Sequence, residues 1–214
     1  MSTQYANGNV AQAALAQLLI DRGLNPRNRL VGQDSVVAEA LANILSGQIG
    51  ELDAMAPGAG ALGTGGFLKR SVVREGGLVI TRILTDLTGL ASSTTDLDII
   101  GQGASAAHFG QITAAVNGTI IGGSLRCLEA PAGGVTDIDL YKATVGTGVF
   151  DAAVTGLTGQ AAVITSGAAW TLGREVATAA DGIAAGDYLY LACGAAGTPA
   201  TYTAGRLLLT LIGI

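Results

Sequence analysis

The chain has 214 residues, of which 49% are hydrophobic and only 13% are charged, and its formal net charge is −5. Average soluble domains carry about 25% charged residues, so this composition favours a protein that buries much of its surface against copies of itself or a partner. The acidic balance, with only two lysines (Lys69 and Lys142), leaves no basic footprint for phosphates, and we therefore expect no nucleic-acid partner.

The apolar runs are shorter than the roughly 18 residues that span a bilayer, so the sequence predicts no transmembrane helix and no membrane partner. The first residues lack the basic-then-apolar plan of a signal peptide, which predicts synthesis in the cytoplasm. Cys127 and Cys193 lie far apart in apolar runs and fit neither a metal knuckle nor a redox pair, so we expect both to be free and buried.

Residues 1–56 are predicted to form an N-terminal helical arm. Two helices are expected in it, from Val10 to Ile20 and from about Ser35 to Met55. The second helix has apolar residues at a spacing of three and four. Leu41, Leu45 and Leu52 on that stripe are interface candidates, and they could pack on their own β domain or on a neighbouring subunit.

A Gly/Ala linker is predicted over 57–66. It contains a G-x-G-x-x-G string, but a helix and Pro57 precede the string where a dinucleotide-binding fold needs a strand. The pattern therefore favours a flexible linker, and we expect no cofactor.

Beyond the linker, in residues 67–214, the apolar period becomes strand-like. Ser71–Glu75 and Leu78–Thr85 flank Gly76-Gly77, a two-residue hairpin signal. Further strands are expected at 109–116, 119–128, 135–143, 161–165, 187–193 and 206–214, with Asn117-Gly118 as another hairpin signal. Short strands at this spacing predict a mainly β domain, an antiparallel β-sandwich or jelly roll.

The last expected strand is apolar on both faces. Leu207, Leu209 and Leu211 share one face, because strand side chains alternate. Leu208, Thr210 and Ile212 share the other face, which favours a central strand covered on both sides. Leu208, Ile212 and Ile214 are therefore further interface candidates.

Two Asp-x-Asp pairs, Asp96/Asp98 and Asp137/Asp139, could each project from one face of a strand. Such a pair can hold a hard cation such as calcium or act as an acid/base pair. It can equally be the solvated face of an amphipathic strand, which we favour because apolar residues surround the second pair.

Lys69, Arg70, Arg74 and Arg82 form the one basic cluster of the expected strands. The cluster could meet an acidic patch on a partner or be the polar face of the first hairpin, and the polar face is slightly favoured. Arg70 and Arg74 are kept as interface candidates.

His108 is the only histidine, and no G-x-S-x-G elbow surrounds the nearby Ser105. A structural or interface role for His108 is therefore favoured over a small hydrolase. The large aromatic residues could form a sugar-stacking platform or pack in the core. Because aromatic residues make up only 4% of the chain, packing in the core is favoured. The residues concerned are Tyr141, Trp170, Tyr188, Tyr190 and Tyr202.

The runs 108–113, 135–144, 186–191 and 204–212 resemble small virion proteins of tailed bacteriophages. The likeness is to the head decoration, or cement, proteins of phages that infect cyanobacteria and other aquatic bacteria, and it covers roughly the second two-thirds of the chain. It implies a β-sandwich or jelly-roll subunit, commonly a homotrimer, on the outer face of the head between capsomers of the major capsid protein. It transfers no functional residues.

The sequence therefore predicts a structural virion protein without enzymatic activity, made in the host cytoplasm and carried on the outer surface of the phage head. Its expected partners are the major capsid protein and itself, as a homotrimer. The alternative is a tail- or fibre-associated module that binds host glycans.

Overall fold

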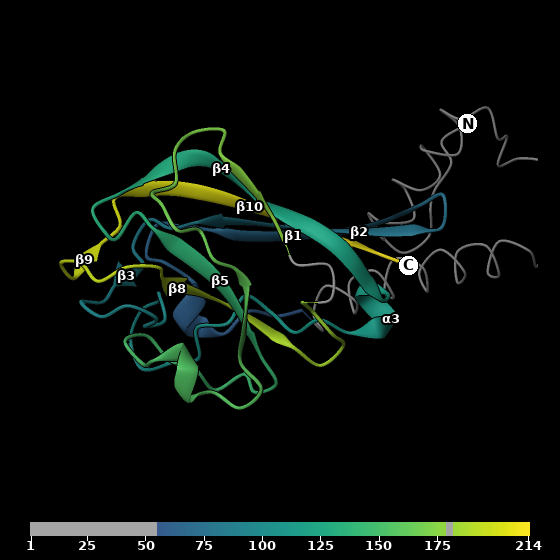
Figure 1. Ribbon diagram of the computed structural model, residues 1–214, viewed down its shortest axis with the longest axis horizontal. Helices are drawn as coiled ribbons and strands as arrows, with labels where there is room; N and C mark the ends of the chain where they lie inside the picture. The colour runs from purple at the N-terminus through teal and green to yellow at the C-terminus, as the bar shows by residue number, and fades with distance from the viewer. Residues whose placement is uncertain (1–54, 179–181) are drawn as a thin grey trace, which may run out of the picture. The chain divides into compact units, whose positions relative to one another are not determined.

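Two antiparallel sheets form the body of the chain in the computed structural model (Figure 1). The structure describes residues 55–178 and 182–214, which belong to one compact unit, Glu51–Ile214. The predicted N-terminal arm, apart from its last residues, lies outside the described residues, and so do the interface candidates Leu41, Leu45 and Leu52.

The larger sheet has five strands in the order β1-β2-β10-β4-β7. Their bounds are β1 Leu68–Glu75, β2 Leu78–Asp86, β10 Ala204–Gly213, β4 Ile120–Ala132 and β7 Glu175–Ala177. The smaller sheet has the order β6-β5-β8, with β6 Ala161–Ile164, β5 Ile138–Ala143 and β8 Tyr188–Cys193. The predictions of a mainly β fold and of antiparallel sheets are confirmed.

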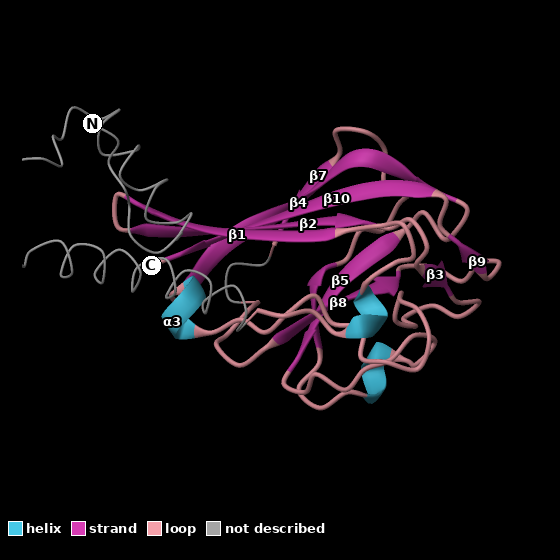
Figure 2. Ribbon diagram, turned by 180° about the vertical axis from the view of Figure 1, so that it is seen from behind, coloured by secondary structure: helices cyan, strands magenta, loops and turns pink. Residues whose placement is uncertain are grey.

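Short elements connect these strands. They are β3 Ala91–Ser92, which pairs with β9 Ala200–Thr201, the one-turn helix α3 Ala114–Asn117, and 3-10 turns at Ala59–Ala61 and Val154–Gly156. Figure 2 shows α3 at one end of the long strands and the β3–β9 ribbon at the other.

The β1–β2 hairpin forms where the sequence predicted it. Gly76 and Gly77 have φ angles of 59° and 84°, which a two-residue turn of the I′ type requires and glycine adopts without strain. The turn fixes the register, with Glu75 opposite Leu78 and Leu68 opposite Thr85.

Strand β10 lies at the centre of the five-stranded sheet, between β2 and β4, as predicted. Leu207, Leu209 and Leu211 are at most 4% exposed and face the core, whereas Leu208 and Ile212 on the other side are half-buried. Only the short strand β9 separates β8 from β10 in the sequence, but β8 and β10 lie in different sheets.

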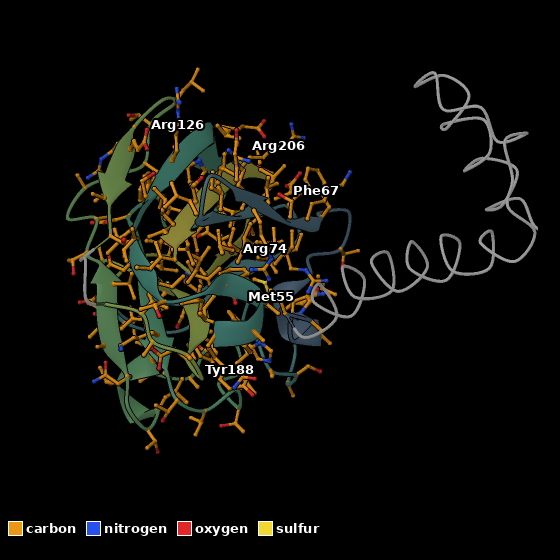
Figure 3. The ribbon with its side chains drawn as sticks, turned by 90° about the vertical axis from the view of Figure 1, so that its right-hand side faces the viewer. Met55, Phe67, Arg74, Arg126, Tyr188 and Arg206 are labelled. Carbon is orange, nitrogen blue, oxygen red and sulfur yellow. The ribbon has the colours of Figure 1, made fainter. Side chains whose placement is uncertain are left out.

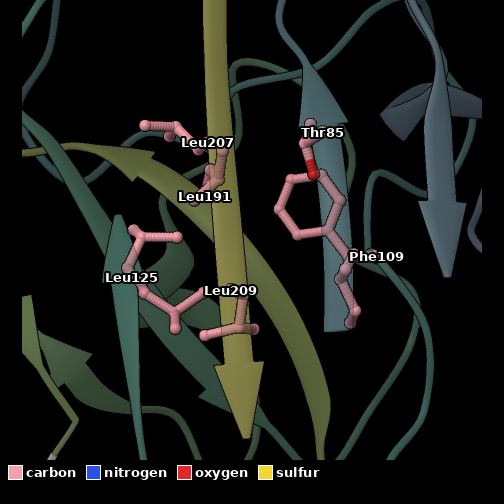
Figure 4. Close-up of a pocket in the computed structure, with 8 residues that line it drawn as sticks. Thr85, Phe109, Leu125, Leu191, Leu207 and Leu209 are labelled. Atoms are coloured by element: carbon pink, nitrogen blue, oxygen red, sulfur yellow. The ribbon is translucent and has the colours of Figure 1, made fainter. Parts of the chain in front are cut away.

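The two sheets pack face to face. Leu125 and Leu209 from the larger sheet meet Leu140 and Leu191 from the smaller one, and Phe109 lies beside them (Figure 4). The gap left between them is only ≈ 10 Å³, about the room that one water molecule needs. The interior is therefore a packed core and has no space for a ligand at this point.

The far side of the smaller sheet is also covered. Tyr141 and Tyr190 on that side pack with Ile99, from the segment between β3 and α3, and with Val154, from the segment after β5. This second cluster buries β5 and β8 on both faces.

Residues 109–116, predicted as a strand, form no strand in the structure. The hydroxyl of Thr113 accepts a hydrogen bond from the Val116 amide (3.3 Å) and caps α3. Gly118, with φ of 68°, then ends the helix, so Asn117-Gly118 closes a helical turn and not a hairpin.

Residues 57–66, predicted as a flexible linker, pack on the segment before Phe109. The amides of Gly58 and Gly60 donate hydrogen bonds to the carbonyls of His108 (2.9 Å) and Ala106 (2.8 Å). A Cβ on Gly58 would lie 2.1 Å from the Ala106 carbonyl oxygen. These glycines therefore permit close packing rather than the flexibility that the sequence predicted.

Candidate functional site

The side of the five-stranded sheet turned away from the three-stranded sheet, here called the outer face, carries most of the large apolar side chains that are exposed in the described part of the chain. Strand register places Val73 beside Ile80 and Ile80 beside Ile212. The apolar end of this face consists of Val73, Leu78, Ile80, Ile121, Ile212 and Ile214.

Four residues of the apolar end are well exposed: Val73 (42%), Leu78 (39%), Ile121 (46%) and Ile214 (61%). Gly122 lies opposite Ile212, and nothing lies within 4 Å of the point where its Cβ would stand. The absence of a side chain there leaves the neighbouring apolar side chains accessible. The predicted interface candidates Ile212 and Ile214 thus belong to one patch.

The middle of the outer face combines apolar and basic residues. Leu208 lies between Leu84 on β2 and Arg126 on β4, and Arg82 lies opposite Thr210. Arg82 and Arg126 are exposed, and Figure 3 shows Arg126 and Arg206 projecting outward from the sheet. The candidate Leu208 is on the same face as Ile212, closer to the charged residues.

The other end of the outer face is polar. The Arg206 guanidinium forms ion pairs with Asp86 (3.2 Å) and Glu129 (3.4 Å) and lies 5.6 Å from the centre of the Phe67 ring. Burial raises the pKa of the Asp86 carboxyl, but hydrogen bonds from Thr88 and Arg206 outweigh it and leave the pKa below its ordinary value. This network keeps Asp86 ionised, and its charged groups pair with one another.

The predicted basic cluster is divided between the two faces of β1. Register places Lys69 and Arg82 on the outer face, and Arg70 and Arg74 on the opposite one. Arg74 donates hydrogen bonds to the carbonyls of Ala115 (2.9 Å) and Val116 (3.3 Å) in α3. Arg74 therefore anchors a helix, and the structure does not place it in the apolar end.

The two Asp-x-Asp pairs, distant in sequence, lie near one another in the structure. Asp98 and Asp139 are only 6% and 2% exposed, so the prediction that the pairs form a solvated face is wrong for these two. Burial raises the pKa of the Asp139 carboxyl, and the nearby charges of Asp137 and Asp96 raise it further.

Hydrogen bonds hold parts of this acidic cluster. The Ser93 hydroxyl lies 2.7 Å from Oδ2 of Asp98 and also contacts Oδ1 of Asp151. Oδ1 of Asp137 is buried without a hydrogen-bond partner. In the described ranges, no three His, Cys, Asp or Glu side chains converge closely enough to hold a metal ion.

His108 is half-buried and packs edge-on against Tyr188, with ring centres 4.9 Å apart. Its Nδ1 atom has no hydrogen-bond partner, and burial lowers the pKa of the imidazole. No carboxylate therefore orients the ring at Nδ1, as a catalytic triad would require. The geometry gives His108 a packing role.

The aromatic residues do not form a platform. Trp170, Tyr190 and Tyr202 are at most 1% exposed and Tyr141 is 9% exposed, so the predicted core role of these four is confirmed. Cys127 and Cys193 are free and buried, as predicted.

Sequence reasoning missed Val73, Leu78, Ile80 and Ile121 as members of the apolar end. Alternation along β1 and β2 could have placed Val73 and Ile80 on the face opposite to the core. Ile121 required the register of β4 against β10, which shifts next to Ile212 and is not visible in the sequence.

Comparison with protein-family models, with curated proteins and with solved structures gave no match. None of the helices in the described residues has the length and apolar character needed to cross a membrane.

Proposed function

We propose that this chain is a structural virion protein without enzymatic activity, a homotrimeric decoration protein on the outside of a phage head. In this role it clamps neighbouring capsomers of the major capsid protein. The observation that carries the proposal is the apolar end of the outer face. Exposed and contiguous apolar side chains of this kind are typical of protein–protein interfaces.

The fold and the resemblance support this assignment. Two facing antiparallel sheets agree with the β-sandwich or jelly-roll subunit that the resemblance to decoration proteins implies. Burial of apolar surface contributes about 25 cal/mol per Å², so a patch of this kind supplies a modest energy per contact. Many such contacts, repeated over a closed shell, stabilise the head together.

The test is binding of the purified full-length protein to expanded heads of cyanobacterial tailed phages that lack their decoration protein. Bound protein is measured after pelleting of the heads. We expect saturable binding by the wild type and at least a tenfold loss in Leu78→Glu, which places a charge in the apolar end. Leu172→Glu is the matched control, because Leu172 is 75% exposed and lies in the turn before β7, outside the apolar end.

Equal loss of binding in both leucine variants would contradict the assignment of the apolar end. Failure of the wild type to bind any such head, at concentrations where it is folded, would contradict the proposed function.

A further inference from the structure

The outer face of the five-stranded sheet carries acidic and basic side chains in equal number. Strand register gives it four of each kind among the described residues. They are Glu75, Asp86, Glu129 and Glu175, with Lys69, Arg82, Arg126 and Arg206. These charges balance, so two copies of this face can meet without the repulsion that a face of one sign would cause.

The apolar end is arranged in rows that run across the strands. One row consists of Val73, Ile80, Ile212 and Gly122, which lie opposite one another on β1, β2, β10 and β4. Gly122 leaves open space in this row, because nothing lies within 4 Å of the point where its Cβ would stand. We call these four residues the Ile80 row.

One acidic and one basic residue flank the Ile80 row on opposite sides. Glu75 lies opposite Leu78, in the row nearer the hairpin turn, and Arg82 lies opposite Ser71, in the row nearer the polar end. Because side chains on one face of a strand recur every two residues, each flanking row is about 7 Å from the Ile80 row. Glu75 and Arg82 are exposed, and neither forms an ion pair or a side-chain hydrogen bond with another described residue.

We propose that the apolar end docks against the apolar end of a second copy of this chain, across a twofold axis that runs perpendicular to the strands above the Ile80 row. This rotation exchanges the two flanking rows, so Glu75 of each copy faces Arg82 of the other. Ile80 and Ile212 each face the same residue of the second copy. Packed sheets lie about 10 Å apart, a distance that a glutamate and an arginine side chain span together.

Charge complementarity favours a second copy as the occupant. A twofold contact uses the same patch on both subunits, so the patch must be complementary to itself. The apolar end meets this condition, because Glu75 and Arg82 lie at equal distances on the two sides of the axis. Burial of the apolar side chains contributes an attraction that salt does not screen, and the two Glu75–Arg82 pairs set the orientation of the copies.

The inference rests on the proposed function for its place on a phage head, and it names the partner of the apolar end there. A twofold contact joins subunits of two neighbouring trimers across the boundary between capsomers. The clamp then runs from subunit to subunit, and each contact adds avidity to the attachment of the trimers to the head.

The test is crosslinking of the full-length Gly122→Cys variant with a short bis-maleimide, whose span suits the roughly 10 Å between packed sheets. The new thiol fills open space in the Ile80 row, where each residue faces itself across the axis. The native Cys127 and Cys193 are buried and should not react. We expect covalent dimers to form at least tenfold faster than in Leu172→Cys, whose thiol lies in the turn before β7. A monofunctional maleimide measures the reactivity of each thiol and corrects for it.

Two charge reversals in the Gly122→Cys background test the orientation of the copies. Glu75→Arg and Arg82→Glu each place like charges together across the axis, and each should slow the formation of dimers about tenfold. The combined variant Glu75→Arg/Arg82→Glu has the net charge of its parent and should recover most of the rate. Arg126→Glu is the matched control, because it reverses an exposed arginine outside the contact, and it should change the rate less than twofold.

Circular dichroism and thermal denaturation of each variant separate loss of association from loss of folding. Recovery of the rate in the combined variant cannot arise from misfolding.

Dimers that form no faster in Gly122→Cys than in Leu172→Cys would overturn this inference, and so would a combined variant that stays as slow as the single reversals. Binding to phage heads without such dimers would leave the proposed function standing and assign the apolar end to the capsid protein instead. Conversely, dimers through this contact without binding to heads would leave the inference standing and contradict the proposed function.

Discussion

The amide of Ser166 donates a hydrogen bond of 2.6 Å to Oδ1 of Asp139, which is only 2% exposed. This bond ties the loop after β6 to the middle of β5. It also places a carboxyl group in a buried position near two other acids, Asp137 and Asp96. Burial and these neighbours raise the pKa of Asp139, although the bond from Ser166 acts in the opposite direction.

Asp139→Asn is expected to make the protein more stable at pH 7. Because the pKa of Asp139 is higher in the folded than in the unfolded chain, the folded state binds more protons between the two values. The free energy of unfolding therefore falls as pH rises through this window. Asparagine keeps an oxygen for the Ser166 amide and removes the charge. The free energy of unfolding of the variant should therefore not show this fall as the pH rises.

Urea denaturation between about pH 4 and pH 8 measures the effect, because the ordinary carboxyl pKa lies near the lower limit. The stability difference between variant and wild type should shrink toward the acidic end. Glu75→Gln, at an exposed acid of β1, is the control and should show no such trend. A variant that is less stable than wild type at pH 7 would contradict the prediction.

Arg174 holds the loop of residues 166–174 together. Its guanidinium donates to the Ser166 hydroxyl (2.7 Å) and the Ser166 carbonyl (2.6 Å), and lies 5.0 Å from the centre of the buried Trp170 ring. Arg174→Ala should lower the free energy of unfolding by about 1–3 kcal/mol, because it leaves these acceptors without their donor.

Arg174→Lys should recover less than half of that loss, since lysine keeps the charge but lacks the planar fork of donors. Urea denaturation measures both variants, and cleavage by a protease within 166–174 should become faster. Arg126→Ala removes an exposed arginine and should change stability by less than about 0.5 kcal/mol. Equal stability of Arg174→Ala and wild type would show that the loop does not depend on this residue.

Tyr202→Phe should destabilise the fold by about 1 kcal/mol. The Tyr202 hydroxyl donates a 2.7 Å hydrogen bond to the carbonyl of Val135 in a buried position, so the variant leaves that carbonyl without this partner. Chemical denaturation gives the difference. Tyr188→Phe, at a half-buried tyrosine, should have a smaller effect, and the reverse order would contradict the prediction.

The local signals in the sequence predicted the strands well where backbone geometry alone determines the structure. Gly76-Gly77 closes a hairpin because both residues have positive φ angles. The alternating apolar residues of β10 predicted its strand form and its central place, although only the face of Leu207, Leu209 and Leu211 is fully buried.

Tertiary contacts decided the rest. Residues 109–116 have the composition of a strand, but the cap at Thr113 and the turn at Gly118 favour one turn of helix. The glycines of 57–66 looked like a linker, although they allow two backbones to approach closely. Composition does not distinguish these two uses of glycine.

The candidate surface was predicted in part. Leu208, Ile212 and Ile214 were identified from alternation along one strand, which needs no partner strand. Alternation along β1 and β2 carried the same signal for Val73 and Ile80. The place of Ile121 and the approach of Asp96 to Asp139 depend on strand register and loop packing, for which a single sequence contains no direct signal.

Adjacent glycines of β4, Gly122 and Gly123, should respond in opposite ways to alanine. A Cβ on Gly123 would lie 2.3 Å from the Thr210 carbonyl oxygen in the neighbouring strand β10, whereas a Cβ on Gly122 would meet nothing within 4 Å. Gly123→Ala must therefore push two paired strands apart, at a cost of about 1–3 kcal/mol. Gly122→Ala should raise stability by about 0.5 kcal/mol, because alanine loses less backbone entropy on folding. Thermal and urea denaturation of the two variants measure the difference, and the sheet geometry would be wrong if Gly123→Ala were as stable as Gly122→Ala.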